Sequence, residues 1–361
     1  MALTAYLGLS LWILCGLIGL AILTFLSLAM VTKIITGEEQ LIYYHHEIGI
    51  MIMATIFLKI INHPILPYLD ITILGIGTFL FCGRVGCLMV GCCHGRPHKW
   101  GVFYHKEHAD AGFTHYYLGV RLFPIQALES IWVLMLVIVG CFMVLGRQAP
   151  GEALAWYVIT YDIGRFIFEF ARGDPERPYH SGFSEGQWTS VILMIAVMWG
   201  ELAGLLPFHL WHITATAGIV LIMTAVATNR KFRSSGKHKL HNPRHVKEIA
   251  DAIDKISSSV SAKAIITDGH TAQDVIPIAT TSLNIQISTG AIKDTVTHID
   301  HYALSYQNRS MTEETARTVA DLIIQVKKLS GASRLITRGN GVYHLLIKPH
   351  NEGVKRWAST L

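Results

Sequence analysis

Long apolar runs alternate with short polar connections from the first residues as far as residue 228. A helix that crosses a bilayer needs about 20 mostly apolar residues. Seven runs have this character, and we expect each to form a membrane-spanning helix: 6–31, 41–61, 68–90, 123–145, 151–171, 187–205 and 209–228. The pattern therefore predicts an all-α polytopic membrane domain, with about seven transmembrane helices, over residues 1–228.

Beyond residue 228 the pattern becomes typical of a soluble domain. In "PRHVKEIADAIDKISSSV" apolar residues recur at spacings of three and four, which predicts an amphipathic helix. "TEETARTVADLIIQVKKL" predicts a second helix, capped by Thr312, while "VIPIATTSLNIQIST" alternates as strands do and "GVYHLLIKP" follows a Gly-Asn-Gly turn. We therefore expect a basic linker at 229–242 and a small α/β soluble domain at 243–361.

The composition agrees with a membrane protein. Hydrophobic residues make up 51% of the 361 residues and charged residues 15%, against about 25% charged in soluble domains. Much of the formal net charge of +5 lies between Arg230 and Lys247, directly after an apolar run, which favours the cytoplasmic side of a membrane for that segment. Because aromatic residues are not interleaved with it, we expect a membrane and not a nucleic acid as its partner.

Ionisable residues inside the predicted spans are the first candidates for function. They cost a few kcal/mol or more near the centre of a bilayer, so they normally face a cavity and have partners. Arg84 lies between Gly83 and Gly86 at the end of the third predicted span. The glycines let a ligand approach, and a guanidinium offers a planar fork of donors to a phosphate. The alternative is a side chain that extends to the membrane surface.

A second polar group occurs in "YDIGRFIFEFARGD", where Arg165, Glu169 and Arg172 are four and three residues apart. This spacing puts the three side chains on one face of a helix. One cation can pair with the acid and leave another for an anionic ligand; the alternative is a structural ladder of ion pairs between helices.

A third polar group occurs in "FPIQALES", where Gln126 and Glu129 begin the fourth predicted span. Glu129 either orders an arginine of another helix or simply caps its own helix. Two arginine sites and two acids within the spans together favour a phosphate-bearing lipid as the ligand.

Four of the six cysteines lie in "CGRVGCLMVGCCHGRP", Cys82 to Pro97. The spacing of Cys87, Cys92, Cys93 and His94 is not that of a zinc finger. A reactive thiol activated by neighbouring arginines is a second interpretation, and small residues for tight packing are the favoured one. We expect no metal and no cofactor.

Four stretches taken together resemble the prolipoprotein diacylglyceryl transferase family, and they occur in that family's order: "GRVGCLMVGCCHGRP", "FPIQALES", "YDIGRFIFEFARGD" and "SEGQWTSV". The resemblance covers roughly residues 42–205. It implies a transferase of the bacterial cytoplasmic (inner) membrane that moves a diacylglyceryl group from phosphatidylglycerol to the cysteine thiol of a prolipoprotein and releases glycerol phosphate. The alternative is a non-catalytic membrane module that senses a lipid or a metal and binds a partner through its soluble tail.

The resemblance also implies roles for individual residues. Arg84 and Arg165 would hold the phosphate, and Glu129 and Glu169 would fix those arginines. His46 would take the thiol proton, with His45 as the alternative. The expected substrate-binding residues are Gly83, Gly86, Cys87, Gly91, Cys92, Gln126, Tyr161, Arg172 and Gln187.

Two cysteines depart from the family pattern. Cys87 stands where the family has asparagine, and Cys92 stands where it has glutamate. The acceptor therefore stays open between a prolipoprotein and another nucleophile, including a thiol of this protein.

Overall fold

The structure is a computed structural model that describes residues 1–37, 42–175, 177–232, 237–266, 277–293, 298–329, 331–337 and 339–349. Its contacts divide the chain into two compact units. The first comprises Met1–Val102, Leu122–Gly173 and Arg177–Asn229, and the second comprises the described residues within Phe103–Arg121, Asp174–Glu176 and Arg230–Leu361.

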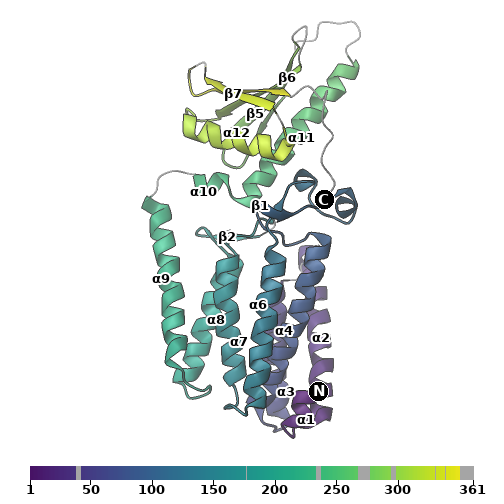
Figure 1. The fold of residues 1–361 in the computed structure, drawn as a ribbon, viewed down its shortest axis with the longest axis vertical. Coiled ribbons are helices and arrows are strands. Elements are labelled where there is room, and N and C mark those ends of the chain that lie inside the picture. The colour runs from purple at the N-terminus through teal and green to yellow at the C-terminus, as the bar shows by residue number, and fades with distance from the viewer. Residues whose placement is uncertain are drawn as a thin grey trace. The chain divides into compact units, whose positions relative to one another are not determined.

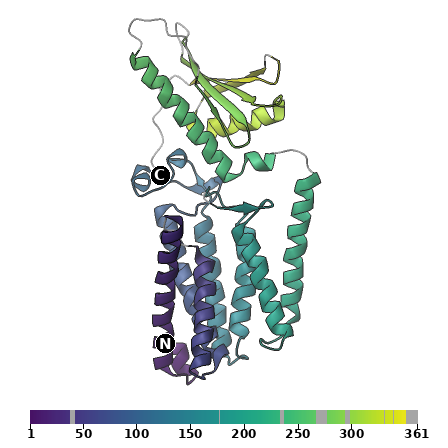
Figure 2. The same cartoon turned by 180° about the vertical axis from the view of Figure 1, so that it is seen from behind.

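The first unit is a bundle of long helices that run side by side (Figures 1 and 2). Its helices are α1 (Ala2–Tyr6), α2 (Leu11–Thr36), α3 (Tyr43–Ile60), α4 (Ile65–Val90), α6 (Ile125–Leu145), α7 (Glu152–Phe168), α8 (Glu185–Leu202) and α9 (Leu210–Phe232). Helix α4 packs against α6, α6 against α7 and α7 against α8. Between helices lie the strand β1 (Pro97–Val102) and the antiparallel pair β2 (Tyr179–His180) and β3 (Phe183–Ser184).

A helix lies at each of the seven predicted spans, but the bounds differ. The first span was predicted at 6–31 and is wrong at its start: α1 ends at Tyr6, Gly8 adopts a left-handed φ of 68°, and α2 begins at Leu11. Within the described residues, four helices are long and apolar enough to cross a membrane: α2, α4, α6 and the Leu210–Arg230 part of α9. Helices α3, α7 and α8 are shorter, with 17 or 18 residues, so the total of seven spans stays a prediction.

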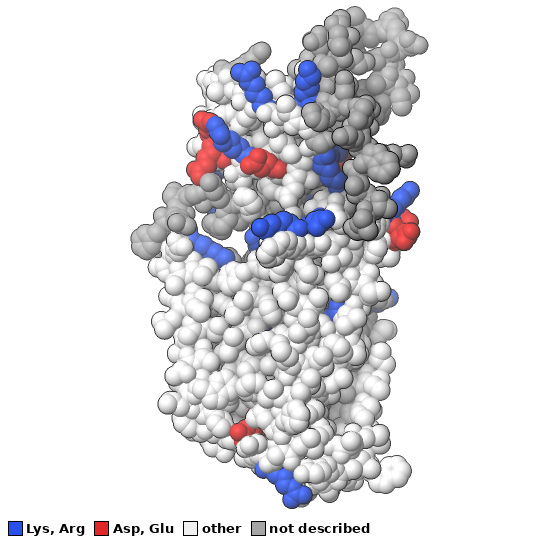
Figure 3. Space-filling model, viewed as in Figure 1, with Lys and Arg blue, Asp and Glu red and all other residues white. Residues whose placement is uncertain are grey.

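The outer surface of the bundle is apolar, as a membrane helix requires. In Figure 3 the face over these helices shows very few charged side chains. Large apolar residues of different helices are exposed, including Leu23, Phe142, Ile192 and Leu221. In a soluble protein such a surface would be a broad apolar patch, whereas in a bilayer it contacts the lipid chains.

Small residues let the central helices approach closely. A Cβ on Gly77 of α4 would lie 2.7 Å from the ring of Tyr157, and one on Gly140 of α6 would lie 2.4 Å from Leu74. Asp70 of α4 accepts hydrogen bonds from the backbone N–H groups of Gly151 (2.7 Å) and Leu154 (2.8 Å). A carboxylate of α4 thus caps the start of α7 and fixes its position along the bundle.

The second unit contains a five-stranded antiparallel sheet with strand order β4-β5-β6-β8-β7 (Figure 1). Its strands are β4 (Ile278–Thr280), β5 (Ile285–Lys293), β6 (His298–Tyr306), β7 (Gly331–Thr337) and β8 (Tyr343–Pro349). Helices α11 (Pro243–Ile266) and α12 (Glu313–Lys327) pack against the sheet and against each other, after a short α10 (Lys237–Leu240). The predicted combination of two helices with strands is therefore present in the C-terminal region.

Candidate functional site

Five predicted residues from α4, α6, α7 and the turn after α7 meet in one network of ion pairs. Arg84, near the end of α4, contacts Glu129 of α6, with 3.0 Å between Nε and Oε2. Arg165 of α7 contacts both acids, with Nη1 3.2 Å from Glu129 Oε1 and Nη2 2.7 Å from Glu169 Oε1. Arg172 Nη1 lies 4.0 Å from Glu129 and 3.9 Å from Glu169. Glu129 is therefore the residue that joins the arginines of α4 and α7.

The network is buried. Glu129 and Arg172 are each 1% exposed, and the other three side chains are also buried. Ion pairs that are removed from water need close geometry. The contacts of Arg84 and Arg165 with the two acids, at 2.7–3.2 Å, provide it, whereas those of Arg172 are longer. Arg177, which the sequence analysis missed, adds a fourth guanidinium through its ion pair with Glu169. It lies in the loop after α7, where no helical spacing relates it to the acid.

The Arg84 guanidinium has N–H groups that its contact with Glu129 does not use. Its contact with Glu129 uses Nε, and in the described part of the chain its two terminal nitrogens make no ion pair or hydrogen bond. A guanidinium carries five N–H donors in a fixed fork. Glu129 thus orients the Arg84 side chain and leaves its outer edge able to bind an anion.

Tyrosines extend the network toward α3. The Tyr161 hydroxyl donates to Glu129 Oε1 over 3.4 Å, and the Tyr161 ring stacks on Tyr157 one turn earlier. The hydroxyls of Tyr157 and Tyr43 are 3.4 Å apart. Sequence reasoning singled out Tyr161 and missed the other two, although the spacing of four between Tyr157 and Tyr161 was a usable signal.

The two predicted glutamines hold backbone beside the network. Gln126 Nε2 donates to the carbonyl of Cys92 over 2.8 Å. Gln187 forms a reciprocal cap with Ser184 at the start of α8 and donates to the carbonyl of Phe166 over 3.3 Å. A Cβ on the neighbouring Gly186 would lie 3.1 Å from Glu169. The start of α8 therefore packs directly on the network, and Gly186 is a second residue that sequence reasoning missed.

The predicted glycines differ in their surroundings. Gly83 and Gly86 are exposed on α4, and a Cβ on either would meet no atom within 4 Å. Packing therefore does not require glycine at these two positions. Gly91 ends α4 in the left-handed region, with a φ of 90°, which glycine adopts most readily.

The two candidate proton acceptors lie in different surroundings. His46 is buried against the ring of Phe25, with 4.4 Å between ring centroids. Among the described residues it has no ion pair or hydrogen bond with the arginine network. His45 points elsewhere: its Nε2 lies 3.2 Å from Oε1 of Glu185, the first residue of α8. The contacts thus link His45, and not His46, to the helix that packs on the network.

The segments that follow α4 and α7 pair with each other. Arg96 N–H donates to the carbonyl of Ala171, and Gly173 N–H donates to the carbonyl of His94, each over 2.9 Å. This pairing brings the cysteines at the end of α4 beside the network. The Sγ atoms of Cys87, Cys92 and Cys93 all lie within 4.8 Å of one another, and hydrogen bonds from the other two thiols hold the pKa of Cys93 well below its ordinary range.

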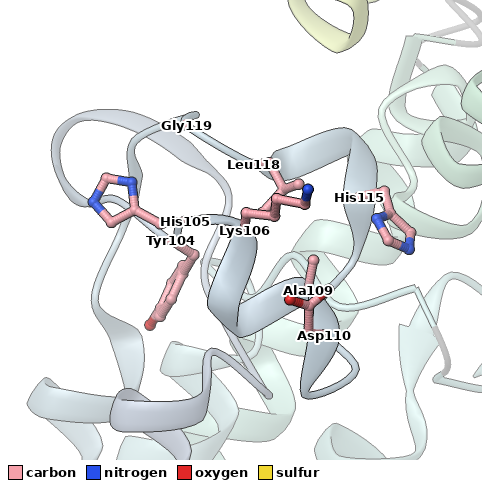
Figure 4. A pocket seen from close by; sticks show the side chains of 8 residues that line it. All are labelled: Tyr104, His105, Lys106, Ala109, Asp110, His115, Leu118 and Gly119. Carbon is pink, nitrogen blue, oxygen red and sulfur yellow. The ribbon is translucent and has the colours of Figure 1, made fainter.

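A separate pocket lies in the second unit, in the segment 103–121. It has a volume of about 420 Å³ and is lined by short elements, α5 (Lys106–Asp110) and η1 (His115–Tyr117) (Figure 4). Lys106, Asp110 and His115 are among its lining residues, and none of the arginines or acids of the network is. The pocket is therefore not part of the site described above.

Comparison with known proteins gives one consistent result. The family model described as prolipoprotein diacylglyceryl transferase matches residues 5–202. Phosphatidylglycerol–prolipoprotein diacylglyceryl transferase of Clostridium tetani is 30% identical over 157 residues, which are 43% of this chain and 60% of that protein. The enzyme of Dehalococcoides mccartyi strain BAV1 is 32% identical over 167 residues, 45% of this chain and 60% of that protein.

A second clostridial relative, phosphatidylglycerol–prolipoprotein diacylglyceryl transferase 2 of Clostridium perfringens, is 30% identical over 136 residues, 36% of this chain and 49% of that protein. The chain thus spans half to 60% of the length of the relatives it matches. No solved structure matches it significantly. Because the family model covers more than half of the residues, including the whole arginine network, the chain belongs to the prolipoprotein diacylglyceryl transferase family.

Proposed function

We propose that this chain transfers the diacylglyceryl group of phosphatidylglycerol to a thiol, the cysteine of a prolipoprotein or a related nucleophile, and releases glycerol phosphate. The observation that carries the proposal is the buried network in which Glu129 orients Arg84 and leaves its terminal nitrogens able to bind. The names of the family and of its relatives support the choice of lipid and acceptor.

The proposed reaction needs positive charge beside the leaving phosphate, and the arginines supply it. A thiolate sulfur attacks the glycerol carbon of the diacylglyceryl group, a C–S bond forms, and the C–O bond to the phosphate breaks. The electron pair of that bond goes to the phosphate oxygen, so negative charge grows on the leaving glycerol phosphate. Arg84 and Arg165, held in place by Glu129 and Glu169, stabilise that charge where it develops, which is commonly the largest catalytic contribution.

In this proposal a histidine of α3 accepts the proton of the acceptor thiol. His46 is the residue that the family resemblance favours, and His45 is supported by the 3.2 Å contact of its Nε2 with Oε1 of Glu185 at the start of α8. Separate His45→Ala and His46→Ala variants decide between them, because only the loss of the proton acceptor shifts the pH at which transfer reaches half its maximum.

We place the protein in the bacterial cytoplasmic membrane as a multi-pass protein. The apolar exposed surface of the bundle and four helices of membrane-spanning length among the described residues support this location.

The test uses the full chain in vesicles of phosphatidylglycerol labelled in its headgroup, with a peptide that carries the acceptor cysteine. We expect release of labelled glycerol phosphate that depends on the peptide. Arg84→Ala and Arg165→Ala should each lower the rate by about 10²–10³-fold, the cost of losing one donor to a developing oxyanion.

Arg147→Asn is the matched control. Arg147 is an exposed arginine just after α6 that lies over the ring of Tyr6, outside the network, and asparagine tolerates its positive φ. The control should match the parent chain. Lipid binding without any release, while a known family member is active in the same vesicles, would replace the proposal with a non-catalytic lipid-binding module.

A further inference from the structure

The end of α4 folds back on itself. Gly91 ends the helix with its N–H donating to the carbonyl of Cys87 over 2.9 Å, and its φ is 90°. Cys93 has a φ of 55°, also in the left-handed region. The hydrogen bond from Gln126 holds the carbonyl of Cys92 between these two turns. This backbone returns Cys92 and Cys93 over the last turn of α4, so that three thiols face one point.

The spacing of the three sulfurs suits a thiophilic metal. Zinc binds thiolates at about 2.3 Å, so two thiolates on one tetrahedral zinc lie about 3.8 Å apart. The Sγ atoms of the cluster are all within 4.8 Å of one another, and a small contraction brings them to that distance. Backbone strain at a non-glycine residue such as Cys93 tends to persist at functional sites.

Three ligands leave one position open. His94 follows directly, but its Nδ1 contacts the carbonyl of Gly95 at 2.9 Å, and its nitrogens do not belong to the group of converging ligand atoms. Cys92 is exposed, so another ligand can reach the cluster. Three protein ligands and an open fourth position are the arrangement of catalytic zinc sites, whereas structural sites are closed by four ligands.

Charge favours the same assignment. Three thiolates and one Zn²⁺ carry a net charge of −1, which nearby cations can balance. Arg172 and Arg84 lie near enough to interact electrostatically with the thiol of Cys93. The guanidinium groups that approach the phosphate site therefore also offset the charge of a zinc–thiolate group.

We propose that Cys87, Cys92 and Cys93 bind one zinc ion, whose fourth ligand is the thiol of the acceptor. On binding, the acceptor thiol loses its proton to solvent or to a histidine, because a zinc-bound thiol is deprotonated. The resulting thiolate lies beside Arg84 and attacks the diacylglyceryl carbon as described above. This second part rests on the proposed transferase function, whereas the metal site does not.

The metal site is tested without any measurement of activity. We expect the purified full chain to contain about one zinc per chain by elemental analysis, and the zinc-free chain to bind Co²⁺ with a thiolate-to-cobalt charge-transfer band. Cys87→Ser and the double variant Cys92→Ser/Cys93→Ser should lose at least ten-fold in zinc affinity. Cys82→Ser is the matched control, because Cys82 lies on the same helix, is exposed and stands outside the cluster, and it should bind zinc as the parent does.

The fourth ligand is tested on the unmutated cobalt-loaded chain, so misfolding of a variant does not affect the result. A peptide with the acceptor cysteine should change the cobalt spectrum, and the same peptide with serine should not. Zinc binding without any transfer would support the metal site and refute the transferase. Transfer by a chain that binds neither Zn²⁺ nor Co²⁺, or a Cys87–Cys92 disulfide in the active protein, would overturn the zinc site.

Discussion

Replacing Glu129 by glutamine removes the charge that Arg84, Arg165 and Arg172 share while preserving the shape of the side chain. At separations of 3.0 and 3.2 Å, each of the two closest pairs has a Coulomb attraction of about 5 kcal/mol at an effective dielectric constant of 20. Desolvation offsets much of this attraction. Breaking a buried pair by removing one partner costs about 3–5 kcal/mol, because it leaves an uncompensated charge.

The cost should appear as a lower melting temperature. For a unit of about this size, 1 kcal/mol shifts Tm by about 2–4 °C, so Glu129→Gln should lower the apparent Tm by about 6–20 °C. Tryptophan fluorescence of the full chain in detergent measures it. Adding Arg84→Met to Glu129→Gln should restore part of the loss, since the cation left without its carboxylate is then removed.

Glu185→Gln is the matched control. Among the described residues, the acidic group of Glu185 contacts a half-exposed His45, and surface pairs contribute at most about 1 kcal/mol. Equal Tm values for Glu129→Gln and Glu185→Gln would refute the view that the network is a buried, mutually dependent set of charges. An additive double variant would refute the coupling between Glu129 and Arg84.

Three further predictions concern single residues. Arg165→Lys keeps the charge, but one ammonium group cannot contact Glu129 and Glu169 with two separate nitrogens as the guanidinium does. The rate of glycerol phosphate release should therefore fall by about 10²-fold or more. A rate near that of the parent chain would contradict this role of Arg165. Asp70→Ala removes the cap of α7 and should lower the stability of the bundle by about 1–2 kcal/mol in the same melting assay; an unchanged Tm would count against the cap. Burial lowers the pKa of His245 in α11 below its usual 6.5, so the unfolded chain binds more protons and stability should be lost as the pH falls through 6.5. Hydrogen exchange of α11, corrected for its intrinsic pH dependence, should therefore quicken between pH 7.5 and 5.5 in the parent and change less in His245→Gln.

The predicted spans that the structure corrects differ from it in where a helix begins or ends. A single first span was expected from residue 6, but Gly8 interrupts the helix before Leu11. Apolar content alone does not mark such a break, because apolar residues lie on both sides of it. The span predicted at 151–171 likewise ends earlier, at Phe168, and the turn beyond it carries Arg172 into the network.

The sequence by itself determined what depends on neighbouring residues. Apolar runs of membrane-spanning length located the helices, and the spacing of four put Arg165 and Glu169 on one side of the chain, because the helical repeat is fixed by local backbone geometry. The same argument does not hold for Arg172, which lies beyond the end of the helix. Only the tertiary structure decided which groups meet across helices: that Glu129 of α6 joins Arg84 to Arg165, that Arg177 reaches Glu169, and that the thiols converge. The contacts between helices depend on how the helices rotate and pack against one another, and the convergence of the thiols depends on the left-handed residues Gly91 and Cys93. The periodicity of apolar residues along the chain encodes neither the packing nor these turns.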